Sequence, residues 1–177
     1  MAERDERGSL PDHVLSIEIA ASVEDVWAEI TKTGRIQRAM YNTVLESDLK
    51  PGAKLRYYSP DKKRVFIVGE VKEVEAPRRL VHTYMMTMKP EAPTLVTWEL
   101  EEIDSGCRIT LTHSDWTTQT NHEKVAKGWG EIFGMLKSEL ETGDISLGWK
   151  IMYGIMSFTM FMLPKTTKVE EVDRQGW

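Results

Sequence analysis

The sequence predicts an α+β protein in which a curved antiparallel sheet wraps around a long C-terminal helix. Two observations predict this class. Six extended segments follow one another between residues 43 and 114, and a helix with one apolar face comes next, over 122–142. An antiparallel sheet buries one apolar face and needs a covering layer, which this helix supplies. The chain has 177 residues, enough for one such domain.

The first elements of the chain are a strand and a helix. Residues 1–12 are charged and lack an apolar segment, so we expect a flexible leader there. Polar and apolar residues alternate over 13–19, which predicts a strand. Ser22 then starts a helix that has acidic residues in its first turn, and Gly34 ends it. We expect a second short helix over 35–40.

The six extended segments predict strands joined by short turns. Turn residues separate them, for example Pro51-Gly52 and Asp104-Ser105-Gly106. Such short connections are typical of an antiparallel meander. The expected strands are 43–49, 53–59, 64–75, 79–88, 94–103 and 106–114.

An apolar segment over about 147–163 is the most unusual part of the sequence. It lies in an extension over 144–177 that follows the predicted domain at 13–143. Lys150 is its one charge, and apolar residues occupy every side of a helical wheel, so this helix is buried in protein or in lipid. Three alternatives remain: packing on the domain or on a second subunit as a homodimer, contact with a membrane surface or a ligand's path, and a span across the bilayer.

Charge and cysteine content exclude several classes of function. Lys and Arg number 23 against 28 Asp and Glu, and the formal net charge is −5, with no block of basic residues. Binding to phosphates needs clustered positive charge, so we expect no nucleic-acid partner. Cys107 is the only cysteine, which excludes an internal disulfide. The lone cysteine and an N-terminus unlike a secretory signal favour a cytoplasmic protein.

Several motifs, in order along most of the chain, resemble those of the START-like (SRPBCC) superfamily. They are IEIAASVEDVWAEIT (17–31), LKPGAKLRYY (49–58), GEVKEVEAPRRLVHTY (69–84), VTWELEEIDSGCRITLTHS (96–114) and GWGEIFGMLKSELETG (128–143). The closest branch that they resemble is the heat-shock ATPase activator-like, or Aha-type, group. The resemblance implies the helix-grip fold of START and birch-pollen-allergen-like proteins, with a hydrophobic cavity between the sheet and the long helix. Different branches use this cavity for lipids, polyketides or hormones.

The strand pattern and the implied cavity together predict a set of ligand-binding residues. These are Trp27, Leu55, Tyr57, Ile67, Tyr84, Met86, Trp98, His113, Trp129 and Phe133. His113 and His82 allow three roles: an acid or base, a polar anchor for a ligand, or a structural group. Metal-ligand spacings such as HxH or CxxC are absent from the sequence, so we expect no metal, no cofactor and no catalytic residue.

Three function classes follow. The first, which we favour, is non-enzymatic binding of a small hydrophobic molecule, such as a lipid or a polyketide-like compound. The second is a protein-interaction module similar to the chaperone activators of the resembled branch. The third is an enzyme similar to the aromatases and cyclases of another branch.

Overall fold

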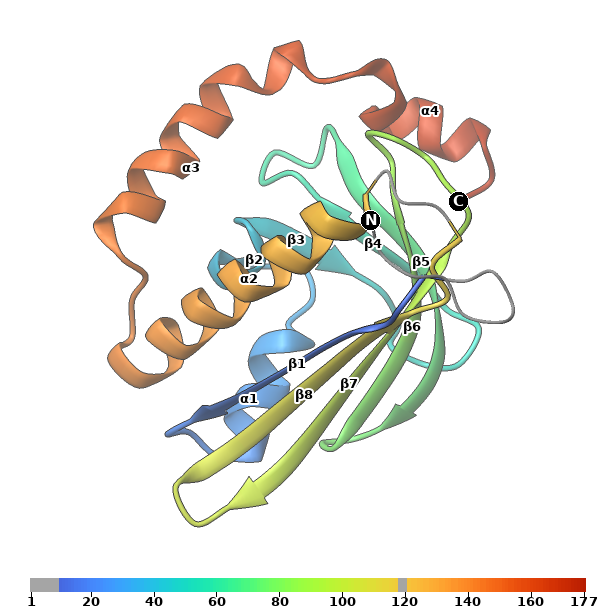
Figure 1. Cartoon of the computed structure of the whole chain (residues 1–177). Helices are drawn as coiled ribbons and strands as arrows, with labels where there is room; N and C mark the ends of the chain where they lie inside the picture. The colour runs from blue at the N-terminus through green and yellow to red at the C-terminus, as the bar shows by residue number, and fades with distance from the viewer. Residues whose placement is uncertain (1–9, 118–120) are drawn as a thin grey trace.

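The computed structural model describes residues 10–117 and 121–177, and its main feature is a strongly curved antiparallel sheet (Figure 1). Eight strands follow the order β1-β8-β7-β6-β5-β4-β3-β2. They are β1 (His13–Ile19), β2 (Ile36–Gln37), β3 (Thr43–Glu46), β4 (Lys54–Tyr58), β5 (Val65–Glu75), β6 (Arg79–Met86), β7 (Thr94–Ile103) and β8 (Gly106–Ser114). The fold class predicted from the sequence is confirmed. Residues 1–9 of the expected leader lie outside the described residues, and Leu10 is buried.

The helices lie between the strands or after the last strand. They are α1 (Val23–Ile30), η1 (Arg38–Met40), α2 (His122–Thr142), α3 (Leu147–Thr159), η2 (Met160–Met162), η3 (Lys165–Thr167) and α4 (Val169–Arg174). The long helix α2 buries the apolar face that the sequence predicts, which includes Val125, Trp129 and Phe133. It contacts β1 at one edge of the sheet and η1 next to the other edge, so it closes the curved sheet across its opening.

The prediction of a second short helix over 35–40 holds only for a single 3-10 turn at Arg38–Met40. The residues before this turn form the edge strand β2. The backbone of Gln37 pairs with Thr43 of β3. The amide of the Gln37 side chain donates to the carbonyl of Glu29 at 3.0 Å, at the end of α1. The segment therefore serves as an edge strand and as a cap for the preceding helix. Both roles depend on contacts with other segments, so local periodicity does not reveal them.

An irregularity in β5 accompanies the curvature of the sheet. The pairing of β5 with β6 shifts by one residue between Val71 and Glu73, and such a β-bulge bends and twists a strand. At Gly69 the two strands approach each other so closely that a Cβ atom would lie 2.0 Å from the carbonyl oxygen of Thr83. Glycine is required here because any side chain would collide with β6.

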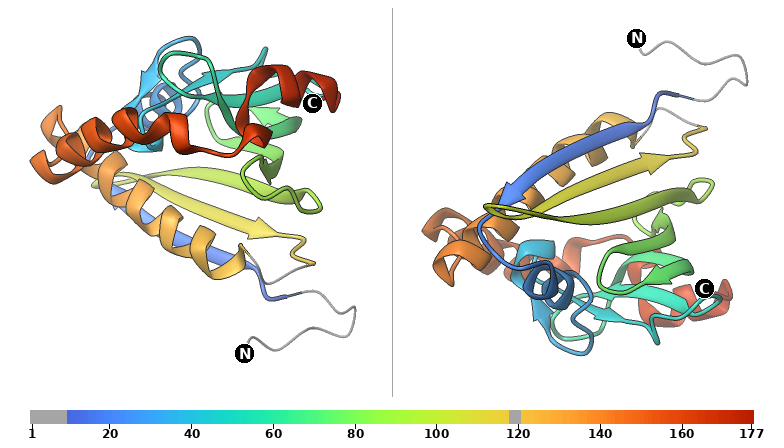
Figure 2. Two further views of the ribbon diagram at one scale, coloured as in Figure 1. Left: turned by 90° about the horizontal axis from the view of Figure 1, so that it is seen from above. Right: turned by 90° about the horizontal axis from the view of Figure 1, so that it is seen from below.

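The chain beyond α2 crosses the opening of the sheet and returns to its outer surface. Figure 2 shows α3 passing beside α2, and α4 lying against the strands β4 and β5. Val172 of α4 packs against Val65, Val68 and Met85, on the outer side of β5 and β6. Arg64 donates to the carbonyl oxygens of Leu163 and Pro164 nearby. The segment that contains α3 is therefore attached to the domain at both of its ends.

Candidate functional site

A cavity of about 410 Å³ lies between the concave face of the sheet, α2 and α3. Ligand pockets in proteins measure about 300–1,000 Å³, so its size fits a small molecule. Most of its lining side chains are apolar or aromatic. The lining comprises Met40, Tyr41, Thr43, Tyr57, Phe66, Ile67, His82, Tyr84, Met86, Met88, Lys124, Val125, Gly128, Trp129, Ile132, Met156, Thr159, Met160 and Leu163.

Three neighbouring strands form one wall of the cavity. Alternate residues of a strand point to the same face, so His82, Tyr84 and Met86 of β6 lie together on the concave side. Met86 pairs with Ile67 of β5, and Ile67 pairs with Tyr57 of β4. The residues that point to the other face of β5 and β6, such as Val68, pack against α4 instead.

The helix α3 and the turn η2 form the opposite wall. Tyr153 of α3 is buried, and its hydroxyl donates to the carbonyl oxygen of Arg38 at 2.6 Å. Trp149 lies edge-on to Tyr41, with 5.7 Å between ring centroids. The residues of this segment that line the cavity are Met156, Thr159, Met160 and Leu163. One face of the apolar helix therefore covers the cavity.

The other face of α3 consists of exposed apolar side chains. Phe158 is 80% exposed. The further exposed apolar residues of this segment are Leu147, Ile151, Met152 and Ile155 of α3 and Phe161 and Met162 of η2. In the part of the chain that the structure describes, no helix is both long and apolar enough to cross a bilayer.

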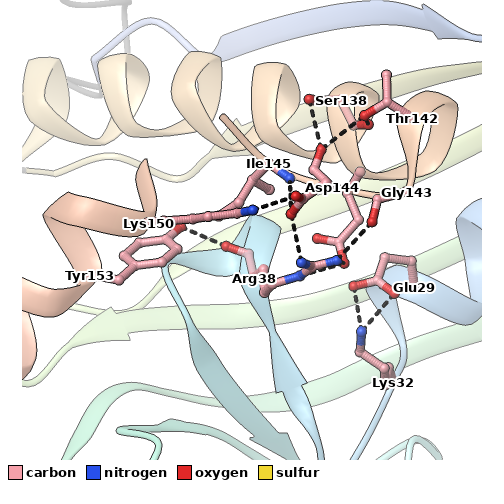
Figure 3. Close-up of polar contacts among 11 residues, drawn as sticks. Glu29, Lys32, Arg38, Ser138, Thr142, Gly143, Asp144, Ile145, Lys150 and Tyr153 are labelled. Atoms are coloured by element: carbon pink, nitrogen blue, oxygen red, sulfur yellow. Dashed lines mark hydrogen bonds and ion pairs between the residues drawn. The ribbon is translucent and has the colours of Figure 1, made fainter. Parts of the chain in front are cut away.

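Ion pairs hold the connection between α2 and α3 (Figure 3). Gly143 ends α2 with a φ of 78°, a left-handed conformation that suits glycine. The Asp144 carboxylate accepts a hydrogen bond from Arg38 at 2.9 Å and pairs with Lys150 at the start of α3. Arg38 also pairs with Glu139 of α2 at 2.9 Å. Because Arg38 lies beside the edge of the sheet, this group joins α2, α3 and the sheet.

Aromatic rings fill the space between the sheet and α2 next to the cavity. Trp98 of β7 is 1% exposed. Its ring lies edge-on to Trp129, with 5.5 Å between centroids, and 6.1 Å from the ring of Phe133. This arrangement is typical of packed aromatic cores. We call this region the packed end of the interior, and the region of the cavity the hollow end.

His113 lies in the packed end at the centre of a hydrogen-bond network. The indole N–H of Trp129 donates to Nδ1 of His113 at 2.9 Å. An indole nitrogen only donates, so Nδ1 carries no proton and the proton of the neutral ring is on Nε2. Nε2 lies 2.7 Å from the hydroxyl oxygen of Thr94, and that hydroxyl donates to the carbonyl of Tyr84 at 3.0 Å. Both ring nitrogens of His113 are therefore satisfied.

Burial keeps His113 neutral. It lowers the pKa of His113 far below the usual value, and the nearby His82, His13 and His122 lower it further. A neutral imidazole with both nitrogens engaged orients Trp129 and has no free lone pair. This environment favours the structural role among the three that the sequence leaves open.

His82 lies at the hollow end and has only one of its nitrogens engaged. It is 1% exposed. Its Nδ1 lies 2.9 Å from the carbonyl oxygen of Thr83. Its Nε2 is buried and has no hydrogen-bond partner among residues 10–117 and 121–177. Burial lowers the pKa of His82 to about 4, so its ring is neutral at pH 7.

The structure divides the predicted ligand-binding residues into two groups. Those that line the cavity are Tyr57, Ile67, Tyr84, Met86 and Trp129. Those that lie in the surrounding core, outside the lining, are Trp27, Leu55, Trp98, His113 and Phe133. Whether they bind a ligand stays a prediction. His82, which the sequence leaves open as a ligand anchor but which is not in the predicted set, also lines the cavity, because its position two residues before Tyr84 places it on the same face of the strand.

The described part of the chain offers little basis for metal binding or for nucleophilic catalysis by cysteine. No group of three His, Cys, Asp or Glu side chains is placed there to hold a metal ion. Cys107 is buried in β8, and burial raises the pKa of its thiol. A thiol with a raised pKa is a poor nucleophile.

A curved sheet that grips a long helix, with an apolar cavity between them, defines a START-like protein of the helix-grip class. Within this class, the model of the family described as "Activator of Hsp90 ATPase homolog 1-like protein" matches residues 20–141. The chain belongs to this family, and the resemblance stated from the sequence motifs is confirmed. A comparison with curated proteins finds no match.

Solved structures of the same fold are similar to this chain at low identity. CalU16 from Micromonospora echinospora is 21% identical, with a TM-score of 0.60, over 81% of this chain and 82% of its own. The Aha1 dimer from Colwellia psychrerythraea is 17% identical, with a TM-score of 0.63, over 76% and 98%. DynU16, of the dynemicin biosynthetic locus, is 22% identical, with a TM-score of 0.64, over 76% of this chain but only 48% of its own. These likenesses show the fold alone.

Proposed function

We propose that this protein binds a small hydrophobic molecule, such as a lipid or a polyketide-like compound, in the cavity between the sheet and α2. The observation that carries this proposal is an apolar cavity of about 410 Å³ under the cover of α3. Burial of apolar ligand surface stabilises a complex by about 25 cal/mol per Å² before the costs of binding are subtracted. A similar structure, DynU16, comes from a biosynthetic locus, which is compatible with a small-molecule ligand.

Two features of the lining support an adaptable site. Tyr57, Tyr84 and Trp129 supply rigid aromatic surface. Met40, Met86 and several further methionines supply flexible and polarizable side chains, which fit ligands of varied shape. We propose that a ligand contacts both sets, while the packed end holds Trp129 in place.

Native mass spectrometry of protein purified without detergent tests this proposal, combined with titration of the neutral apolar dye Nile red. Met86→Trp fills the cavity and should weaken dye binding at least about tenfold, which corresponds to about 1.4 kcal/mol. Met152→Trp makes the same exchange on the exposed face of α3 and serves as the control. A chain that binds neither co-purified molecules nor dye contradicts the proposal, as does dye binding that Met86→Trp leaves unchanged.

We also propose that the exposed apolar face of α3 contacts a second copy of this chain. Monomeric proteins rarely expose a continuous apolar patch of this kind, and one similar structure is described as a dimer. Sedimentation of the native chain and of the double variant Ile155→Ser, Phe158→Ser tests this contact. We expect a dimer that the variant dissociates. A native monomer that instead sediments with phospholipid vesicles indicates the membrane-surface alternative.

Membership in the activator family favours a second candidate function, a protein-interaction module for an Hsp90-type ATPase. Its test is the ATPase rate of such a chaperone with and without this chain. Stimulation that persists in Met86→Trp indicates an interaction that does not need the cavity. An unchanged ATPase rate and no binding reject this candidate.

A further inference from the structure

We propose that the ligand of this cavity is a neutral apolar alcohol or phenol whose hydroxyl group donates a hydrogen bond to Nε2 of His82. This inference rests on the proposed ligand-binding function and adds the polar group that the ligand must carry. Its basis is the one buried imidazole nitrogen of the cavity wall that lacks a partner within the described residues.

The position of the proton on His82 decides which kind of group it binds. Nδ1 lies 2.9 Å from the carbonyl oxygen of Thr83. A carbonyl oxygen only accepts hydrogen bonds, so Nδ1 carries the proton and donates it. The neutral ring then presents a lone pair at Nε2, which accepts a hydrogen bond but offers none. Esters, ethers and ketones cannot satisfy it, whereas a hydroxyl group can.

The backbone around His82 holds this ring in place. Thr83 lies next to Gly69 of β5. The two strands are so close there that position 69 has no room for a side chain. The hydroxyl of Thr83 also accepts a hydrogen bond from the amide of Glu70 at 2.8 Å. The carbonyl that orients the imidazole thus lies where β5 and β6 are in close contact and where the Thr83 side chain replaces a backbone partner for Glu70. A buried polar atom without a partner destabilises a protein, so a ligand that pairs with Nε2 removes this cost.

The charges around the cavity favour a neutral ligand. Lys124 is the one ionisable ammonium group of the lining, and it is exposed on the first turn of α2. The hydroxyls of Tyr57 and Tyr84 lie on the same strand wall as His82. Because Lys124 is exposed to solvent, it does little to offset the cost of burying an anion beside His82, and such an anion would also face the lone pair of Nε2. Nε2 is buried, so a ligand oxygen can reach it only if side chains of the lining move, and methionine is the most adaptable of these.

Two probes of equal shape test the proposal: 2-naphthol, which carries a hydroxyl donor, and 2-methylnaphthalene, which has a methyl group in its place. Affinities are measured by quenching of tryptophan fluorescence for the native chain and for His82→Phe. We expect His82→Phe to lower the affinity for 2-naphthol about tenfold. The affinity for 2-methylnaphthalene should stay unchanged or increase. The ratio of the two effects cancels the difference in hydrophobicity between the probes.

Two further variants complete the test. His13→Phe removes a histidine outside the cavity and should affect both probes equally. His82→Gln keeps an acceptor and should retain most of the preference for 2-naphthol. Should His82→Phe fail to fold, the ¹⁵N NMR shift of Nε2 in the native chain provides the same test, because 2-naphthol should move it and 2-methylnaphthalene should not.

The outcomes distinguish this inference from the proposed function. If both probes bind and His82→Phe weakens them equally, the cavity binds ligands but the hydroxyl recognition is wrong. The same conclusion follows if the NMR shift of Nε2 stays unchanged on binding of 2-naphthol. If neither probe binds the native chain, the proposed function is contradicted for aromatic ligands of this size, and the inference is overturned with it.

Discussion

The packed end and the hollow end lie between the same sheet and the same helix, yet only the packed end, at β7 and β8, is filled, whereas β4, β5 and β6 form the wall of the cavity. At the packed end, Trp98, Trp129 and Phe133 occupy the space between β7 and α2. At the hollow end, Met86 and its neighbours leave a cavity of about 410 Å³. Ring contacts with Trp98 hold α2 against β7, and this allows β4, β5 and β6 to stand away from α2 across the cavity.

The two buried histidines show the same contrast in their hydrogen bonds. His113 has both ring nitrogens engaged and positions Trp129. His82 has one engaged nitrogen and one buried nitrogen without a partner in the described chain. A satisfied buried network rigidifies a core, whereas an unsatisfied group at a cavity marks a candidate binding position.

Removal of the largest side chain of the packed end should have the greatest effect on stability. Trp98→Ala is expected to lower the free energy of unfolding by about 3–5 kcal/mol, because it leaves a large void in a close-packed region. Met88→Ala at the hollow end, where the side chain is 39% exposed, is the control and should lower it by less than about 1 kcal/mol. Urea unfolding measures both. Equal losses would contradict the division into a packed and a hollow end.

The second prediction compares the two histidines. His113→Phe leaves the indole N–H of Trp129 without an acceptor and removes the hydrogen bond that the Thr94 hydroxyl accepts, which should cost about 2–4 kcal/mol of stability. His82→Phe removes one hydrogen bond together with an unsatisfied nitrogen, so we expect a change of about 1 kcal/mol or less. Urea unfolding of the two variants tests the difference. A larger loss for His82→Phe would show that its ring is the structural one.

The third prediction concerns pH. Unfolded histidines bind a proton as the pH falls below 6.5, whereas native His82 stays neutral down to its pKa of about 4, and His113 to lower pH still. The unfolded state then holds more protons, so the free energy of unfolding should fall with decreasing pH. For each of the two histidines the slope of this free energy against pH approaches about 1.4 kcal/mol per pH unit. Unfolding at pH 7.5, 6 and 5 measures this slope. His82→Phe should have a shallower slope between pH 6.5 and 4, and an identical slope would rule out a depressed pKa for His82.

The smallest effect is expected at the cover of the hollow end. Tyr153→Phe removes the hydrogen bond from α3 to the carbonyl of Arg38 and should cost about 1 kcal/mol. Hydrogen exchange should increase in α3 and remain unchanged in α2. Tyr58→Phe, which removes a hydroxyl outside the cavity, is the control. Faster exchange in α2 as well would indicate that α3 stabilises the whole domain and not only the cover.

Much of the fold follows from local patterns, but the site does not. The long helix is predicted over 122–142 and observed as His122–Thr142, because one apolar face repeats every three to four residues. Alternation places Tyr57, Tyr84 and Met86 correctly on the concave face. Trp98 and His113 have the same alternation but lie in the packed end. No local pattern distinguishes the two groups, because the distance between sheet and helix depends on residues far apart in sequence.

The order of the strands and helices outside residues 35–40, the family and the apolar character of the segment around α3 could all be predicted from the sequence. These properties depend on periodicity, turn residues and composition, which are encoded within short stretches of chain. Tertiary contacts determine that β5 bends beside Gly69, that residues 35–40 form an edge strand and a turn, and that one face of α3 covers a cavity while the other is exposed. Each of these depends on contacts between segments that are distant in sequence, and the lone pair of His82 became visible only once those contacts were in place.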